Sequence, residues 1–278
     1  MRRSPARWTL LFGCATAVAL TSSCASKIPQ VSDLEGDPAE LAEKGRAWVA
    51  RSVAVHGGYE AWSALGDVAF TMRDTWEGLG DFLGPDFPVD DPQVRYHYHY
   101  GLNKGRMSFA GARGAAWGHD SREGWCEQGG ERTYDRVDDA TFIVPTLAYF
   151  FALPFKFADP GVRPYYAGRR DYHGAGAESV LITFGEGVGV VQDRYLAFFD
   201  PATARLVGTT YTVKEKPFTP EADAQYLAWR EVGGLVMPGR IEIDLIRPLT
   251  GDLQTMEFFD IDLDAEFDRR LYEKPDAR

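Results

Sequence analysis

The sequence predicts a mainly β (α+β) fold in which a curved antiparallel sheet or barrel follows short N-terminal helices. Three observations lead to this prediction. The hydrophobic period changes from about 3.6 residues to about 2 near Asp67. About ten short alternating segments follow, separated by turn residues. A strongly apolar segment from Phe142 to Phe157 interrupts them.

The N-terminus has the composition of a bacterial secretory signal. Arg2, Arg3 and Arg7 flank the start of an apolar stretch that runs from Trp8 to Leu20, and small residues follow it. The stretch is short for a membrane span. We therefore expect residues 1–23 to be a signal peptide.

The end of this signal, LTSSC, resembles the lipobox of bacterial lipoproteins. The aliphatic residue is Leu20, one position earlier than in the commonest pattern, with Thr21 in its place. We expect Cys24 to be acylated (palmitate among its chains) and residues 24–36 to tether the chain to the membrane. Ala25 favours the outer membrane of the cell envelope, facing the periplasm. An ordinary signal with a chance cysteine is the alternative.

The chain is acidic, with a formal net charge of −11, and loss of the signal arginines makes it more so. An acidic surface repels nucleic acids, so we expect no nucleic-acid partner. Cys14 leaves with the signal, so Cys126 has no cysteine to pair with and is expected to pack as a small apolar residue. No linker divides residues 37–278, which we expect to form one domain.

An amphipathic helix is expected to start at Asp37, which can cap it. Pro38 stands at the first helical position, and Glu40 completes a capping-box spacing. The seven-residue spacing predicts a buried face formed by Leu41, Trp48 and Val55, with Ala50 and Ala54 between them.

His56-Gly57-Gly58 follows this helix. A His-Gly-Gly run supplies oxyanion-hole backbone in some esterases, but there it follows a strand and accompanies a G-x-S-x-G motif, which this sequence lacks. We therefore expect the glycines to end the helix, and YEAWSAL to form a second short helix closed by Gly66.

Strands follow in two groups. In VAFTMRDTW, Phe70, Met72 and Trp76 alternate with Ala69, Thr71 and Arg73. In VRYHYHYGL, Tyr96 and Tyr98 alternate with His97 and His99. The other predicted strands are GRMSFAG, GAAWGHD, GWCEQGG, SVLITFGEG, DRYLAFFD, RLVGTTYTVK, QYLAWREV, LVMPGRIEIDLI and LQTMEFFDIDL.

The apolar segment from Phe142 to Phe157 is interrupted by Pro145 and Pro154, and Pro154 should end any helix near Leu153. Two interpretations are compatible: a buried core helix, and a lid that lies across the concave face of the sheet.

Three stretches together resemble the LolA-like periplasmic lipoprotein-carrier superfamily, in an uncharacterised bacterial lipoprotein branch. They are HGGYEAW, LPFKFADPGV and LITFGEGVGVVQDRYLAFFDPATARLVGTTYTV. The strand, the Asp200-Pro201 turn and the return strand carry most of the likeness, and Asp200 can accept hydrogen bonds from its own turn. The resemblance implies an unclosed, curved antiparallel barrel with helices over its concave face. It also implies an apolar cavity for acyl chains and no catalytic residues.

We therefore predict a lipid-anchored envelope protein that binds an acyl chain, a lipid or an acylated protein, without catalysis and without a cofactor. The residues expected to line the cavity are Phe70, Met72, Trp76, Tyr96, Tyr98 and Phe150.

Two alternatives stay open. A metal-dependent envelope enzyme would use His97 and His99, which share one strand face, with a third ligand from His119 or a carboxylate. A structural or protein-binding lipoprotein would fill the barrel with its own side chains. FGEGVGV has phosphate-loop glycines but runs into a strand, so we expect a hairpin.

Overall fold

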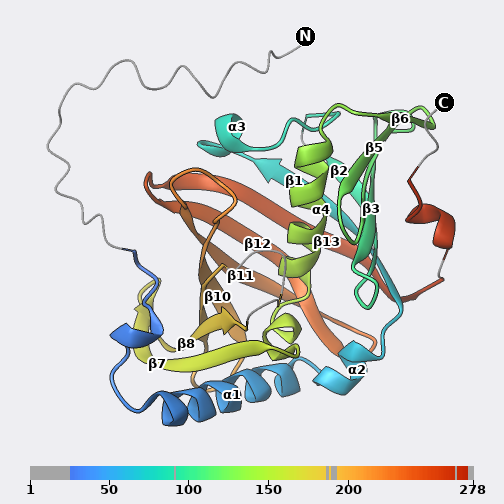
Figure 1. Cartoon of the computed structure of the whole chain (residues 1–278). Helices are drawn as coiled ribbons and strands as arrows, with labels where there is room; N and C mark the ends of the chain where they lie inside the picture. Colours follow the sequence, from blue (N-terminus) through green and yellow to red (C-terminus); the bar gives the residue numbers. More distant parts are fainter. Residues whose placement is uncertain (1–25, 91, 186–187, 189–192, 267, 275–278) are drawn as a thin grey trace, which may run out of the picture.

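One curved, unclosed antiparallel sheet of thirteen strands forms the body of the protein. The structure is a computed structural model that describes residues 26–90, 92–185, 188, 193–266 and 268–274 (Figure 1). The strands in it are β1 (Asp67–Trp76), β2 (Gln93–His99), β3 (Lys104–Phe109), β4 (Ala116–Asp120), β5 (Gly124–Gln128), β6 (Glu131–Thr133), β7 (Val162–Tyr172), β8 (Ala175–Phe184), β9 (Tyr195–Phe199), β10 (Leu206–Thr212), β11 (Glu221–Val232), β12 (Leu235–Arg247) and β13 (Gly251–Ala265). The predicted mainly β, unclosed barrel is confirmed.

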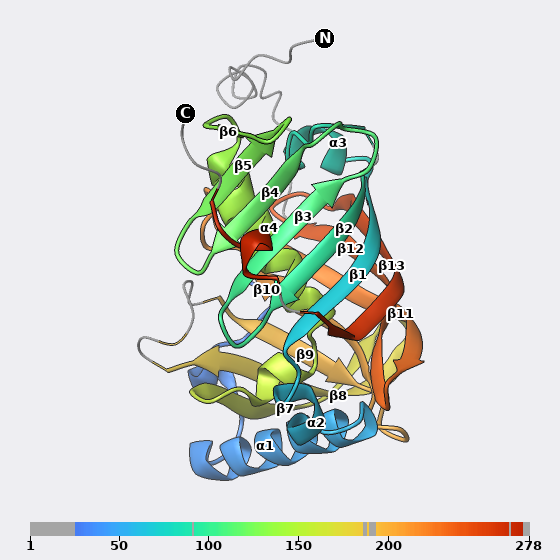
Figure 2. The same cartoon turned by 90° about the vertical axis from the view of Figure 1, so that its right-hand side faces the viewer.

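The strand order is β6-β5-β4-β3-β2-β1-β13-β12-β11-β10-β9-β8-β7, so β6 and β7 are the two edges. Each strand pairs with the next one along the chain, except that β6 and β7 do not pair, and β1 also pairs with β13, the last strand. Figure 2 shows β6 to β1 and β13 side by side in this order. The chain passes from edge β6 to edge β7 through helix α4 (Val137–Phe151), which crosses the concave side of the sheet.

The helical elements besides α4 are short, apart from α1. They are η2 (Val31–Asp33), α1 (Pro38–Val55), α2 (Tyr59–Ser63), α3 (Gly80–Leu83), η3 (Phe155–Ala158) and η4 (Arg269–Leu271). The Asp37 carboxylate caps α1 as expected, accepting from the N–H groups of Ala39 and Glu40 at 2.8 and 3.2 Å. No helix in the described part of the chain is both long and apolar enough to cross a bilayer.

Helix α1 lies along edge strand β7, which corrects its predicted buried face. The buried residues are Leu41, Gly45, Val49, Ser52 and Val53, whereas Val55 is 40% exposed, Ala50 and Ala54 are exposed and Trp48 is half-buried. A β-carbon at Gly45 would lie 2.8 Å from the Pro164 backbone of β7. Only a residue without a side chain fits at this contact, so the side of α1 that contains Gly45 faces β7. The helix thereby shields the open edge of the sheet.

His56-Gly57-Gly58 ends α1, as predicted. Gly57 and Gly58 have φ of 108° and 94°, and the His56 carbonyl accepts from the Val236 N–H at 2.9 Å. A β-carbon at Gly57 would lie 2.5 Å from the Gly234 carbonyl oxygen. The motif therefore joins α1 to the turn between β11 and β12.

The apolar segment forms a longer helix than predicted. α4 begins at Val137 and continues through Pro145, which was expected to interrupt it, and it ends at Phe151, close to the predicted end. A proline inside a helix removes one backbone N–H donor, here at position 145. α4 has seven buried residues, so the interpretation as a core helix is confirmed.

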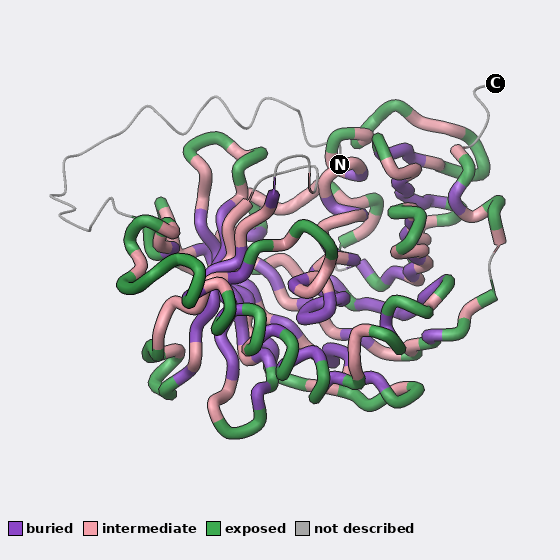
Figure 3. Tube along the Cα trace, turned by 60° about the horizontal axis from the view of Figure 1, so that its bottom comes forward, coloured by how far each residue is buried: buried purple, intermediate pink, exposed green. Residues whose placement is uncertain are grey.

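The N-terminal segment packs on the outer side of the sheet. Ile28, 1% exposed, joins Leu181 of β8 with Leu196 and Phe198 of β9 in a second, smaller core. Figure 3 shows the main core where the strands converge, with exposed residues at the turns. Cys126 is buried and free, and burial raises the pKa of its thiol to about 12. The expected signal peptide, Cys24 and residues 186, 187, 189 and 190 of FGEGVGV lie outside the described residues.

Candidate ligand-binding face

Four of the six predicted cavity residues lie together on the concave face. Phe70 and Met72 of β1 and Tyr96 and Tyr98 of β2 are all buried there, because alternate residues of a strand share a face. Phe70 stacks on Tyr96, with ring centroids 4.8 Å apart.

The other two predicted residues lie elsewhere. Phe150 of α4 is buried against Tyr211 of β10, with centroids 4.9 Å apart. Trp76, at the end of β1, is only partly buried. Its indole N–H donates to the Asp74 carboxylate at 3.1 Å. The predicted set therefore spans the face rather than forming one cluster.

Helix α4 covers this face with its own aromatic side chains. Phe151 stacks on Phe70 at 4.1 Å between centroids and lies 5.3 Å from Phe258 of β13. These contacts occupy the space in which the sequence predicted an apolar ligand.

Three tyrosines, two in strands and Tyr100 directly after β2, hold the backbone of α4. The Tyr96 hydroxyl donates to the Val144 carbonyl, the Tyr100 hydroxyl to the Ala148 carbonyl at 2.9 Å, and the Tyr226 hydroxyl to the Phe150 carbonyl at 2.8 Å. The last bond has a local cause. In a continued helix the Phe150 carbonyl would accept from residue 154, but Pro154 has no N–H, and the Leu153 N–H reaches that carbonyl only at 3.4 Å. α4 is thus attached through a few hydrogen bonds as well as through apolar contact.

Tyr149 of α4 carries a buried hydroxyl that makes no hydrogen bond within the described structure. Its ring lies 5.5 Å from that of Tyr195 in β9, which in turn lies 5.8 Å from Tyr211. Burial raises the pKa of Tyr149, so the phenol stays neutral and can donate. An unpaired buried hydroxyl costs about 1–3 kcal/mol, and a ligand carbonyl or ester oxygen would satisfy it.

Asp74 is a fully buried carboxyl on the same face of β1 as Phe70 and Met72. It accepts from Gln254 Nε2 at 2.6 Å and from the Trp76 indole. Burial raises its pKa to about 6, against the lowering effect of these two donors. The concave face therefore holds a proton-binding group beside its aromatic wall.

Comparison with solved structures identifies this arrangement, although no protein-family model matches the chain and no curated protein resembles it in sequence. A domain assigned to outer membrane lipoprotein sorting, from Vibrio parahaemolyticus, superposes with a TM-score of 0.51 at 12% identity, over 83% of this chain and 97% of the other. A LolA superfamily protein from Nitrosomonas europaea gives 0.51 at 11%, over 83% and 97%. The chain has the LolA-superfamily fold. A DUF1329 family protein from Desulfovibrio piger shares it, at 0.51 and 11%, over 86% and 98%.

The proposed third metal ligand does not reach the two histidines in this LolA-like barrel. Residues paired across strands share a face, and His119 of β4 lies opposite Gly105, which lies opposite Tyr98. His119 is therefore on the core side with Tyr98, whereas His97 and His99 are on the other side. Among the described residues no group of three or more His, Cys, Asp or Glu side chains is arranged to hold a metal ion.

Sequence reasoning missed Asp74, Tyr149 and Tyr226. The signal for Asp74 was available, because the alternation that selects Phe70, Met72 and Trp76 also selects Asp74. Tyr149 stands beside the predicted Phe150 but faces β9. The pairing of Tyr226 with Phe150 depends on the three-dimensional course of the chain and has no local signal.

Proposed function

We propose that this chain is a lipid-anchored protein of the bacterial envelope, in the outer membrane facing the periplasm, that binds an acyl chain, a lipid or a lipoprotein on its concave face. α4 is the cover of that face and moves aside for the ligand. Phe70, Met72, Tyr96, Tyr98 and Phe150 contact the acyl chain, and Trp76 lies at the rim. The chain carries out no chemical step.

The unpaired Tyr149 hydroxyl is the observation that supports binding most directly. Buried polar groups are nearly always paired, because leaving one unpaired destabilises the fold. A hydroxyl kept within an aromatic wall, without a partner in the described structure, is suited to a polar group that arrives with the ligand. An acyl ester supplies such a group next to an apolar chain.

A structural or protein-binding lipoprotein is the second candidate. It is favoured by the occupation of the concave face by Phe151 and its neighbours. Under this hypothesis α4 never leaves the sheet. The two candidates predict different results when a lipid is added to the protein. Under the first the protein binds the lipid, and under the second it does not.

Titration of the purified protein with a fluorescent long-chain fatty acid ester tests the proposal. We expect saturable binding that weakens about tenfold in Tyr149→Phe, since one hydrogen bond to the ligand is lost. Tyr134→Phe is the matched control, because Tyr134 is 71% exposed and should bind as the unmodified chain does. If neither the unmodified chain nor the two variants bind the ester, the structural or protein-binding candidate, with a barrel filled by its own side chains, is favoured.

A further inference from the structure

The C-terminal segment crosses the outer side of the sheet, away from the face that α4 covers. From the end of β13 it runs over strands β2 to β4, where Figure 2 shows it in red. Within residues 268–274 only Tyr272 is buried, at 2% exposure. Its hydroxyl donates to Asp67 Oδ1 of β1 at 2.7 Å. One aromatic side chain therefore fixes this segment to the sheet.

A lysine two residues later makes a second attachment. Lys274 pairs with the Asp120 carboxylate at 3.1 Å and with the Glu123 carboxylate. These two acids stand at the end of β4 and just before β5. The side chains of Arg269 and Arg270 in η4, in contrast, are 82% and 86% exposed. The sheet thus contacts the segment through an aromatic residue and a cation two positions apart.

Beneath the segment, neighbouring strands present a row of outward-facing side chains. His97 of β2 lies opposite Arg106 of β3, Arg106 opposite Gly118 of β4, and Gly118 opposite Trp125 of β5. The Trp125 ring lies over Gly118, where a β-carbon would be 2.1 Å from it, and the Arg106 guanidinium lies 5.3 Å from the ring centroid. Asp67 of β1 stands diagonally beside His97. We call Asp67, His97, Arg106 and Trp125 the outer platform.

Three polar atoms of the outer platform are buried and make no hydrogen bond within the part of the chain that the structure describes. They are Trp125 Nε1, Asp67 Oδ2 and His97 Nδ1. Trp125 is 0% exposed and Asp67 is 3% exposed, although both face outward from the sheet. Buried polar groups are nearly always paired, because an unpaired one destabilises the state that buries it. The C-terminal segment therefore covers the outer platform without satisfying it.

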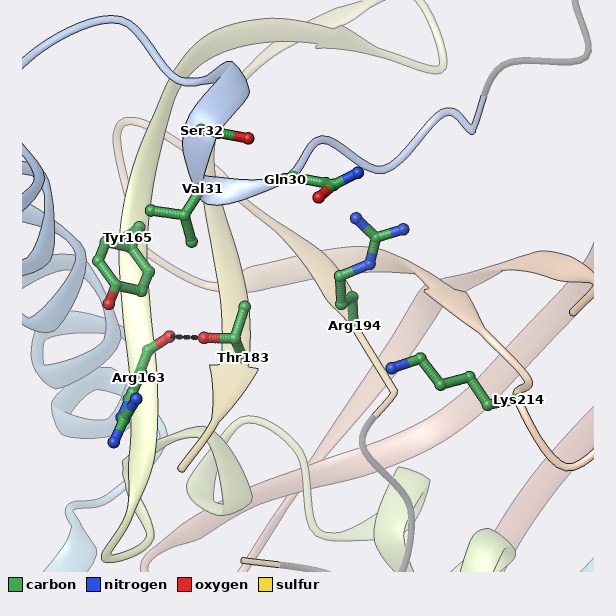
Figure 4. Close-up of a pocket in the computed structure, with 8 residues that line it drawn as sticks. All are labelled: Gln30, Val31, Ser32, Arg163, Tyr165, Thr183, Arg194 and Lys214. Carbon is green, nitrogen blue, oxygen red and sulfur yellow. Dashed lines mark hydrogen bonds between the residues drawn. The ribbon is translucent and has the colours of Figure 1, made fainter. Parts of the chain in front are cut away.

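The N-terminal segment also crosses the outer side of the sheet, and it fits there without such a defect. Ile28 is 1% exposed, and Arg194 donates to the Pro29 carbonyl at 3.2 Å. Figure 4 shows the next residues of this segment, with Val31 beside Tyr165 of β7. None of the residues labelled in Figure 4 has a buried side-chain N or O atom without a hydrogen bond. Covering the sheet does not by itself leave polar atoms unpaired.

We propose that the outer platform is a docking site for a short segment of a partner protein, and that the C-terminal segment is its built-in competitor. The partner segment carries a tyrosine with a lysine or arginine two positions later, as Tyr272 and Lys274 stand in this chain. It also supplies an acceptor to Trp125 Nε1 and a donor to Asp67 Oδ2, which the C-terminal segment leaves unpaired. Asp120 and Glu123 exclude an acidic segment. The proposal goes beyond ligand binding on the concave face and does not depend on it.

Fluorescence anisotropy with labelled peptides tests the site in the full chain. The first probe has the sequence of residues 268–274. The unmodified chain should bind it weakly, because its own segment competes at millimolar effective concentration. Lys274→Glu in the chain sets that segment against Asp120 and Glu123, so the affinity for the probe should rise at least about tenfold. Arg113→Glu is the control, because it changes the charge equally at an exposed arginine elsewhere.

Tyr272→Ala is a second way to release the segment and should raise the affinity for the probe as Lys274→Glu does. A probe in which glutamate replaces the lysine should bind neither variant. If no peptide binds either variant, the C-terminal segment is a fixed part of the fold and the proposal is overturned.

A peptide library tests the unpaired atoms. Its members keep tyrosine and lysine two positions apart, vary elsewhere, and are measured on the Lys274→Glu chain. We expect members that bind about tenfold more tightly than the 268–274 probe, a gain that a further Trp125→Phe change removes. The 268–274 probe should bind equally with and without Trp125→Phe, since it leaves the indole N–H unpaired. A library in which the 268–274 sequence binds most tightly would contradict a partner and assign the platform to the chain's own segment.

The concave face is measured separately. The Lys274→Glu chain should bind the fatty acid ester as the unmodified chain does, because Lys274 lies on the other side of the sheet. Loss of peptide binding with ester binding retained, or the reverse, tells which of the two proposals fails.

Discussion

The Tyr226 hydroxyl in β11 donates to the Phe150 carbonyl in α4 at 2.8 Å, where Pro154 offers no N–H and the Leu153 N–H reaches the same carbonyl only at 3.4 Å. Tyr226→Phe should loosen the C-terminal turn of α4, because the buried carbonyl loses its hydroxyl partner. We expect the free energy of unfolding to fall by about 0.5–1.5 kcal/mol, because the long bond from the Leu153 N–H remains. Amide hydrogen exchange should speed up in residues 147–153. Unchanged exchange there, with Tyr134→Phe as control, would argue that this bond does not hold α4.

Tyr149→Phe, in contrast to Tyr226→Phe, should not lower the free energy of unfolding. Removing an unpaired buried hydroxyl leaves the free energy of unfolding unchanged or raises it, while the ligand loses its hydrogen bond. Urea unfolding and ligand titration on the same preparation check both signs. A destabilised variant would show that the hydroxyl has a structural partner.

Asp74 should make stability depend on pH. Its pKa is raised by burial from 3.8 to about 6, so the folded state holds the proton more tightly than the unfolded state. The stabilisation is fully present below about pH 4 and is lost as the pH rises through about 6. It amounts to about 3 kcal/mol.

Unfolding of the unmodified chain and of Asp74→Asn across this range isolates the contribution of Asp74. The unmodified chain should lose stability relative to Asp74→Asn from pH 4 to pH 7. Asp81→Asn, at an exposed carboxylate of α3, is the control. Parallel profiles for all three proteins would contradict a raised pKa at Asp74.

The interpretation of His56-Gly57-Gly58 as structural can be tested with two alanines. Gly58→Ala meets no atom within 4 Å and should cost about 1–3 kcal/mol from backbone strain alone. Gly57→Ala adds a collision with the Gly234 carbonyl and should cost more. Urea unfolding of both variants measures the difference. Equal costs would show that the turn between β11 and β12 moves freely.

Alternation along strands predicted much of the concave face. Phe70 and Tyr96 were selected because they recur every second residue, and they do stack. Strand β7 was not predicted, because Pro164, Gly168 and a run of charged residues obscure its two-residue period. In the structure α1 packs against this edge strand. Of the stripe predicted for α1, Leu41 is buried and Trp48 packs on the core, but Val55 is exposed, because the close contact at Gly45 turns a neighbouring stripe toward β7.

Contacts between distant segments were beyond sequence reasoning. Nothing local connects Tyr226 with Phe150, or Lys27 with Glu221, which are 76 and 194 residues apart. The route of α4 from one sheet edge to the other creates the first contact. The path of the N-terminal segment over β8 and β9 creates the second.

Native mass spectrometry of protein purified gently from its own envelope tests the central claim most directly. We predict a lipid or acylated-peptide adduct at one per chain, which lipid extraction identifies and which Tyr149→Phe reduces while Tyr134→Phe does not. A chain that carries no adduct and takes up no offered lipid, with α4 protected from exchange throughout, would contradict the account.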